Sequence, residues 1–75
     1  MTKQELNVVI EEQVLNLLEE LASKSKSEAM TYRDKFASDE SNANYLQYKI
    51  NERLFQVFQK IRSEEIDIID RLKHN

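Results

Sequence analysis

The chain has 75 residues, of which 40% are apolar and 33% are charged, and its formal net charge is −3. Cysteine is absent and histidine occurs once, which excludes disulfides, thiolate-held metals and any metal site built from several histidines. Glycine and proline are absent too, so the chain lacks the residues that most often make tight turns and kinks. We therefore expect an all-α fold whose connections are built from Ser, Asn and Asp.

The first predicted helix covers residues 3–22. Thr2 and Glu5 have the spacing of a capping box, which is typical of a helix N-terminus. At about 100° per residue, the apolar side chains of this segment fall within an arc of about 200°. They are Leu6, Val8, Ile10, Val14, Leu15, Leu17, Leu18, Leu21 and Ala22.

The middle of the chain is polar and rich in serine. Ser25 and Glu28 have a second capping-box spacing, and Ala29, Tyr32 and Phe36 fall on one helical stripe. These features predict a short second helix over residues 27–37. Residues 38–42 are all polar and include good N-caps, so we expect the next break there.

The third predicted helix covers residues 40–73, and Ser63 offers an alternative N-cap that would divide it in two. Its apolar residues form two neighbouring stripes that together cover about 200°. The first stripe is Leu46, Ile50, Leu54, Val57, Ile61 and Ile68. The second stripe is Tyr48, Phe55, Phe58, Ile66, Ile69 and Leu72.

These two wide apolar faces predict self-association. A helix that packs on a single neighbour needs an apolar stripe of about 100°, and both long helices offer about twice that. We expect an antiparallel helical bundle of two long helices and a short middle helix per chain, completed by homodimerisation. The alternative is a compact, monomeric three-helix bundle. The predicted interface is the second stripe: Tyr48, Phe55, Phe58, Ile66, Ile69 and Leu72.

Polar residues interrupt the apolar arcs of both long helices. Glu65 lies inside the arc of the third helix. We predict that it pairs with Arg62 on the preceding turn, or that the helix leaves the core there, instead of Glu65 forming a buried acidic site. Asn51 and Gln47 interrupt the same arc, and Asn7 and Glu11 interrupt that of the first helix. These four residues are predicted to fix the register between helices.

No set of residues in the sequence indicates catalysis. There is no cysteine nucleophile, no glycine-rich phosphate loop and no Glu-x-x-His pair, and the single histidine, His74, is next to the last residue. We therefore predict a protein that is not an enzyme and that carries no metal and no cofactor.

One basic concentration, Lys24, Lys26, Arg33 and Lys35, supports an alternative function as a small DNA-associated regulator. The acidic remainder of the chain disfavours broad phosphate binding. No apolar run is long enough to span a bilayer, and the polar faces are not rich in Lys and Arg as those of membrane-surface helices are. We expect a small cytoplasmic protein–protein interaction or regulatory module whose partners are a second copy of itself and another protein.

Overall fold

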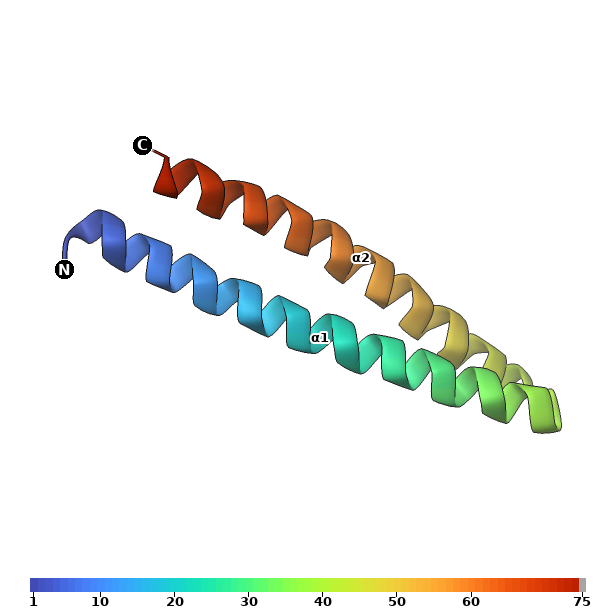
Figure 1. Cartoon of the computed structure of the whole chain (residues 1–75). Coiled ribbons are helices and arrows are strands. Elements are labelled where there is room, and N and C mark those ends of the chain that lie inside the picture. The colour runs from blue at the N-terminus through green and yellow to red at the C-terminus, as the bar shows by residue number, and fades with distance from the viewer. Residues whose placement is uncertain (75) are drawn as a thin grey trace.

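A computed structural model of the chain describes residues 1–74 and shows a hairpin of two long antiparallel helices (Figure 1). Helix α1 runs over Lys3–Asp39 and has 37 residues, and α2 runs over Asn42–Lys73 and has 32 residues. The two helices lie side by side and form a rod 56 Å long, with the start of α1 and the end of α2 at the same end of the rod.

Helix α1 begins at the predicted capping box. The Thr2 side chain accepts a hydrogen bond from the Glu5 backbone N–H at 3.1 Å, and the Glu5 carboxylate accepts one from the Thr2 backbone N–H at 3.3 Å. These bonds satisfy two donors that the helix itself leaves without partners.

The predicted loop at residues 23–26 and the separate short helix over 27–37 are wrong. Helix α1 continues through this segment without a break, because neither glycine nor proline interrupts its backbone hydrogen bonds. Ser25 is buried against α2 and does not cap a new helix. The serine-rich stretch is therefore compatible with a helix, because the small side chain of Ser25 lies on the face of α1 that packs against α2.

The predicted break at residues 38–42 is confirmed, and the turn is short. Glu40 adopts a left-handed conformation with φ of 54°, and its backbone N–H donates to the Phe36 carbonyl at 2.7 Å, which closes α1. Ser41 then caps α2, since its side chain accepts from the Asn44 backbone N–H at 3.1 Å. The Asp39 carboxylate accepts hydrogen bonds from the Ser41 backbone N–H and from the side-chain amide of Asn44. Both bonds lower the pKa of Asp39.

Helix α2 begins two residues later than predicted and is continuous past Ser63. The Ser63 hydroxyl donates to the Gln59 carbonyl one turn earlier at 3.1 Å, as serines do inside a helix. The alternative break at this position is therefore wrong.

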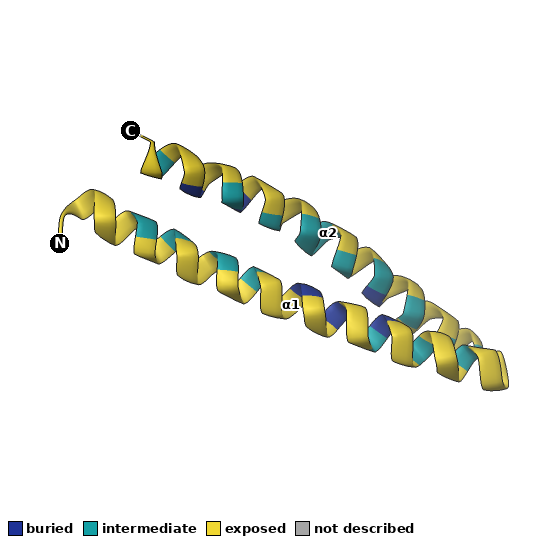
Figure 2. Ribbon diagram, in the orientation of Figure 1, coloured by how far each residue is buried: buried dark blue, intermediate teal, exposed yellow. Residues whose placement is uncertain are grey.

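The contact between the helices is a single seam with coiled-coil spacing. Buried and half-buried residues recur at steps of three and four along the facing sides of both helices (Figure 2). On α1 the seam residues are Val8, Glu11, Leu15, Leu18, Ala22, Ser25, Ala29, Tyr32 and Phe36. On α2 they are Asn44, Tyr48, Asn51, Phe55, Phe58, Arg62, Glu65, Ile69 and Leu72.

Small side chains of α1 meet large ones of α2 in the middle of the seam. Ala29 lies close to Tyr48 and Phe55, and Ala22 lies close to Phe55. Near the turn, the rings of Phe36 and Tyr45 lie 5.4 Å apart between centroids. The expected all-α fold with two long antiparallel helices is confirmed. Because the two helices meet along a single seam, much of their apolar surface is not covered by the other helix.

Candidate interaction surface

The structure places the predicted interface residues inside the hairpin. Five of the six are seam residues of α2, and the sixth, Ile66, is half-buried beside the seam. Ile69 is only 6% exposed, and Lys26 of α1 lies over the ring of Phe55 at 5.7 Å. At the open end, the Leu72 carbonyl accepts a hydrogen bond from the Gln4 side chain at 2.7 Å. The second stripe therefore packs α2 against α1 of the same chain.

One flank of the seam carries charged residues that join the two helices. Arg62 contacts Glu19 at 3.1 Å, and Lys73 contacts Glu12 at 3.3 Å. We call this flank, defined by Glu12, Glu19, Arg62 and Lys73, the charged edge. Its ion pairs are exposed, so each is expected to contribute only about 0.2–1 kcal/mol.

The opposite flank is apolar over residues 10–21 of α1 and 50–61 of α2. Glu12, Glu19 and Lys73 each directly follow a seam residue, whereas the apolar side chains Val14, Leu21, Leu54 and Ile61 each directly precede one. At about 100° per residue these two sets point to opposite flanks of the same seam. Both helices therefore place apolar side chains on the same side of the hairpin, away from the charged edge.

Further apolar residues widen this flank on both helices. Beyond the inner positions, Ile10 and Leu17 extend it on α1, and Ile50 and Val57 extend it on α2. We call the whole surface the apolar face. It consists of Ile10, Val14, Leu17, Leu21, Ile50, Leu54, Val57, Ile61 and Ile68.

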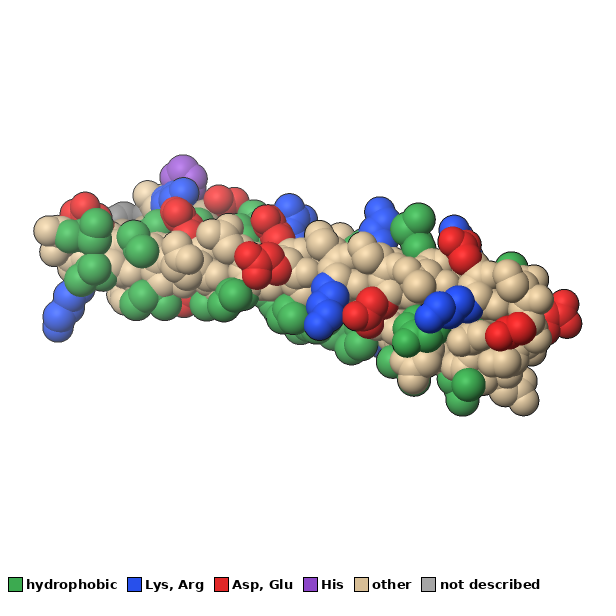
Figure 3. Space-filling model, turned by 90° about the horizontal axis from the view of Figure 1, so that it is seen from below, with side chains coloured by type: hydrophobic (Ala, Val, Ile, Leu, Met, Phe, Trp, Pro, Cys, Tyr) green, Lys and Arg blue, Asp and Glu red, His purple; other side chains and the backbone are tan. Residues whose placement is uncertain are grey.

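The space-filling view shows the separation directly. In Figure 3, hydrophobic side chains gather along the lower edge of the molecule, and acidic and basic side chains are more frequent on its other parts. Three of the four outer residues are the most exposed members of the apolar face, with Leu17 at 59%, Ile10 at 57% and Ile50 at 49%, whereas Val57 is half-buried. An inner residue such as Val14 is 39% exposed. Such a continuous apolar surface is unusual on a protein that acts alone.

The sequence contains the signal that distinguishes the seam from the apolar face. The wide arc of α2 is made of two neighbouring stripes, as in helices that pack on two neighbours at once. On α2, the first stripe forms most of the apolar face and the second stripe forms most of the seam. Periodicity alone reveals both stripes but does not show which of them packs against α1.

The prediction that Glu65 pairs with Arg62 is wrong. Arg62 instead contacts Glu19 of α1, and Glu65 is buried in the seam at 8% exposure. One carboxyl oxygen of Glu65, Oε1, has no hydrogen-bond partner. The neighbouring carboxyl is that of Glu11, which raises the pKa of Glu65 by hydrogen bonding, and burial raises it further. Two of the four predicted register-fixing residues lie in the seam, where Asn51 is buried and donates to the Gln47 carbonyl and Glu11 is half-buried. The other two, Gln47 and Asn7, are exposed and lie outside the seam.

The four basic residues of the alternative DNA-binding function do not form one patch. Lys26 and Arg33 lie on the flank of the charged edge, Lys26 over Phe55, whereas Lys24 and Lys35 lie on the other side of α1. Lys35 also lies over the ring of Tyr32 at 5.0 Å.

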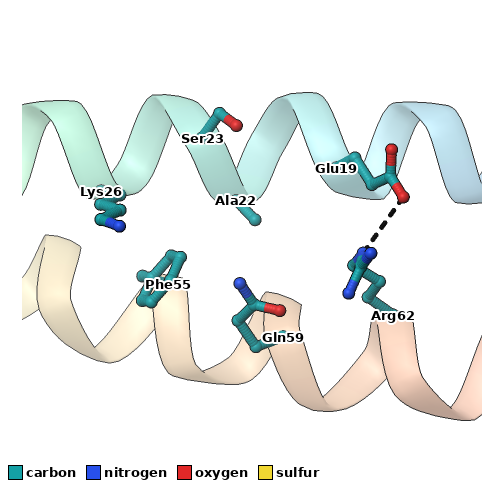
Figure 4. A pocket seen from close by; sticks show the side chains of 7 residues that line it. All are labelled: Glu19, Ala22, Ser23, Lys26, Phe55, Gln59 and Arg62. Atoms are coloured by element: carbon teal, nitrogen blue, oxygen red, sulfur yellow. Dashed lines mark hydrogen bonds and ion pairs between the residues drawn. The ribbon is translucent and has the colours of Figure 1, made fainter.

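A hollow lies between the helices on the charged flank (Figure 4). Ala22 points from α1 toward α2, and its short side chain leaves space beside Phe55 and Gln59. The Glu19–Arg62 ion pair borders one end of this space, and Lys26 borders the other. Ser23 also borders this space, but its hydroxyl points away from Phe55 and Gln59 (Figure 4).

Among residues 1–74, no group of three or more His, Asp or Glu side chains is placed to hold a metal ion. Neither of the two helices is long and apolar enough to cross a membrane. Comparisons of the chain with protein-family models, curated proteins and solved structures find no match. Among the surfaces of the described structure, the apolar face is therefore the most distinctive.

Proposed function

We propose that the protein is a small, cytoplasmic, non-enzymatic interaction module that acts by presenting the apolar face to helices of another polypeptide chain. The observation that supports this proposal is the division of the hairpin into a charged edge and an opposite apolar face. Exposed apolar surface costs free energy in water, and a partner that covers it recovers about 25 cal/mol per Å². Amphipathic helices commonly dock on such surfaces through side chains at steps of three and four residues.

The spacing of the apolar face supports helices as the binding element. Ile10, Val14, Leu17 and Leu21 follow one another at steps of four, three and four residues, as do the seam residues of the same helix. A helical partner can therefore insert its side chains between those of the face in the way that α2 packs against the seam of α1. Extended peptides commonly add to a sheet edge or, when rich in proline, dock in a groove lined by aromatic side chains. The apolar face consists of Ile, Leu and Val on two helices and offers neither.

A photocrosslinking experiment tests this function. A photoreactive phenylalanine analogue replaces Leu17 on the apolar face in one variant and Glu20, on the outer surface of α1, in the control. In the cells that produce the variants, we expect the analogue at position 17 to form covalent products with protein. We expect the analogue at position 20 to form few such products. If position 17 yields no more protein products than position 20, including products between two copies, the proposed function is wrong.

The division of the basic residues between two sides of α1 gives no support to the DNA-associated alternative. A groove-binding protein places its basic side chains on one face so that they neutralise phosphates together.

A further inference from the structure

We propose that the occupant of the apolar face is a second copy of this chain, so that two hairpins pack face to face as a four-helix bundle. This inference rests on the proposed function and names its partner. It differs from the dimer predicted from the sequence in the residues that form the interface, since Phe55, Ile69 and Leu72 already pack within the hairpin.

The width of the apolar face favours a partner with two helices. A single helix laid along the hairpin would lie between α1 and α2 and would cover the inner residues Val14, Leu54 and Ile61. The outer residues would stay exposed, although Leu17, Ile10 and Ile50 are 59%, 57% and 49% exposed and are the least covered members of the face. A second hairpin offers one helix opposite α1 and another opposite α2, as in four-helix bundles, and so covers inner and outer residues together.

The size of the apolar face matches a dimer interface. Its residues have exposed fractions between 37% and 59%, apart from the half-buried Val57, and extend over residues 10–21 of α1 and 50–68 of α2. Their exposed area amounts to roughly 600–700 Å², close to the ~800 Å² that each partner buries in an interface of standard size. A twofold dimer uses the same surface on both copies, so each copy supplies the area that the other needs.

Charge does not oppose this association. On α1 the apolar face holds no charged residue between Ile10 and Leu21, and on α2 it holds none between Ile50 and Ile61. Glu64 lies on the same flank between Ile61 and Ile68, where its exposed carboxylate is at the end of the face. The net charge of −3 therefore repels two copies only from a distance, where salt screens it. The charged edge, with its ion pairs Glu19–Arg62 and Glu12–Lys73, lies on the opposite flank and stays in water in such a dimer.

Sedimentation equilibrium of two charge-matched double variants tests the inference. Leu17→Lys with Ile50→Lys places two positive charges on the outer residues of the apolar face. Gln13→Lys with Gln56→Lys adds the same charge to exposed residues that lie outside the seam and outside the apolar face. We expect the parent and the Gln variant to have twice the mass of the 8.9 kDa chain. We expect the Leu17/Ile50 variant to dissociate at least a hundredfold more readily, with its helical circular dichroism retained.

Three outcomes overturn the inference. A parent that is monomeric over a hundredfold range of concentration shows that a second copy does not cover the face. If position 17 then still crosslinks to a different protein, the proposed function survives and only the identity of the occupant changes. A parent dimer that the Leu17/Ile50 variant leaves intact shows that the dimer uses another surface, and a parent larger than a dimer shows that a further interface exists.

If the Leu17/Ile50 variant also loses helicity, the milder Leu17→Ala variant decides the question. Linked folding and association then predict that its helicity rises with protein concentration. A loss of helicity that is the same at all concentrations overturns the inference.

Discussion

The carboxyl group of Glu65 is buried in the seam beside the carboxyl group of Glu11, and none of the ion pairs among residues 1–74 includes it. Hydrogen bonding to Glu11, burial and repulsion all raise the pKa of Glu65 above its ordinary value of 4.5. The neutral form of Glu65 therefore stabilises the hairpin below about pH 4.5, and this contribution is lost as the pH rises through the raised pKa.

This arrangement predicts that Glu65→Gln is more stable than the parent at pH 7.5 and that the difference shrinks as the pH falls to 4. Glu65→Leu should raise the free energy of unfolding at pH 7.5 by about 1 kcal/mol or more, since it replaces a poorly paired buried carboxylate with an apolar side chain. Urea unfolding followed by circular dichroism at both pH values measures these differences. Glu20→Gln, on the exposed outer surface, is the control and should show little change at either pH. A Glu65→Gln variant that is less stable than the parent at pH 7.5 would contradict the interpretation.

Ile69 is the best-buried large apolar residue of the seam, with 6% exposure. Ile69→Ala should lower the free energy of unfolding by roughly 2–4 kcal/mol, because it removes apolar contacts and leaves a cavity between the helices. Val9→Ala, at a residue 42% exposed and outside both the seam and the apolar face, should change it by less than about 0.5 kcal/mol. Denaturant unfolding of both variants checks this, and equal effects would show that the seam does not contain Ile69.

By the same reasoning Ile69→Asp should unfold the hairpin, while Leu17→Asp should separate two copies that remain folded.

The turn contains a residue whose conformation favours glycine. Glu40 has a φ of 54° and closes α1 through its bond to Phe36. Glu40→Gly should raise the midpoint of thermal unfolding and add about 1 kcal/mol of stability, since the left-handed conformation costs a residue with a Cβ about that much. The matched change Glu20→Gly lies inside α1 and should remove about 1 kcal/mol. Opposite signs for the two substitutions are the expected result, and a destabilising Glu40→Gly would contradict the turn geometry.

The continuity of α1 through its serine-rich stretch can be tested with proline. Ser23→Pro should cost about 3 kcal/mol or more, because residue 23 lies inside an unbroken helix and proline removes a backbone donor. If the chain looped at residues 23–26, proline would be tolerated there. Lys3→Pro is the control, since the first residue of a helix accepts proline readily. Loss of helicity in the first variant and retention in the second, measured by circular dichroism, is the expected pair of results.

Much of this fold can be predicted from particular residues. The capping box of Thr2 and Glu5 predicts the start of α1, and the polar residues around Ser41 predict the turn. Both are local signals, because a side chain bonds to a backbone group a few residues away. The absence of glycine and proline predicts the helical character of the whole chain.

The features that could not be predicted depend on long-range packing. Ser25 and Glu28 have the spacing of a cap, yet α1 passes through them, because a small side chain at position 25 suits the seam with α2. Likewise, Glu65 is three residues from Arg62, but Arg62 meets Glu19 of the other helix. The same limit applies to the candidate surface, where two apolar stripes are visible in the sequence and only the position of α1 decides which of them is already covered.

Both ends of the hairpin lie at the same end of the rod, far from the turn at Glu40 and Ser41 (Figure 1). A mechanical load applied between the two ends would therefore peel α1 from α2 and would not shear the helices along each other. Only the contacts nearest the ends, such as the bond from Gln4 to the Leu72 carbonyl, would resist at first. Each contact would then yield in turn toward Phe36 and Tyr45. A lone hairpin should open like a zipper at low force, whereas a bundle whose apolar faces are joined should hold until the interface between the copies gives way.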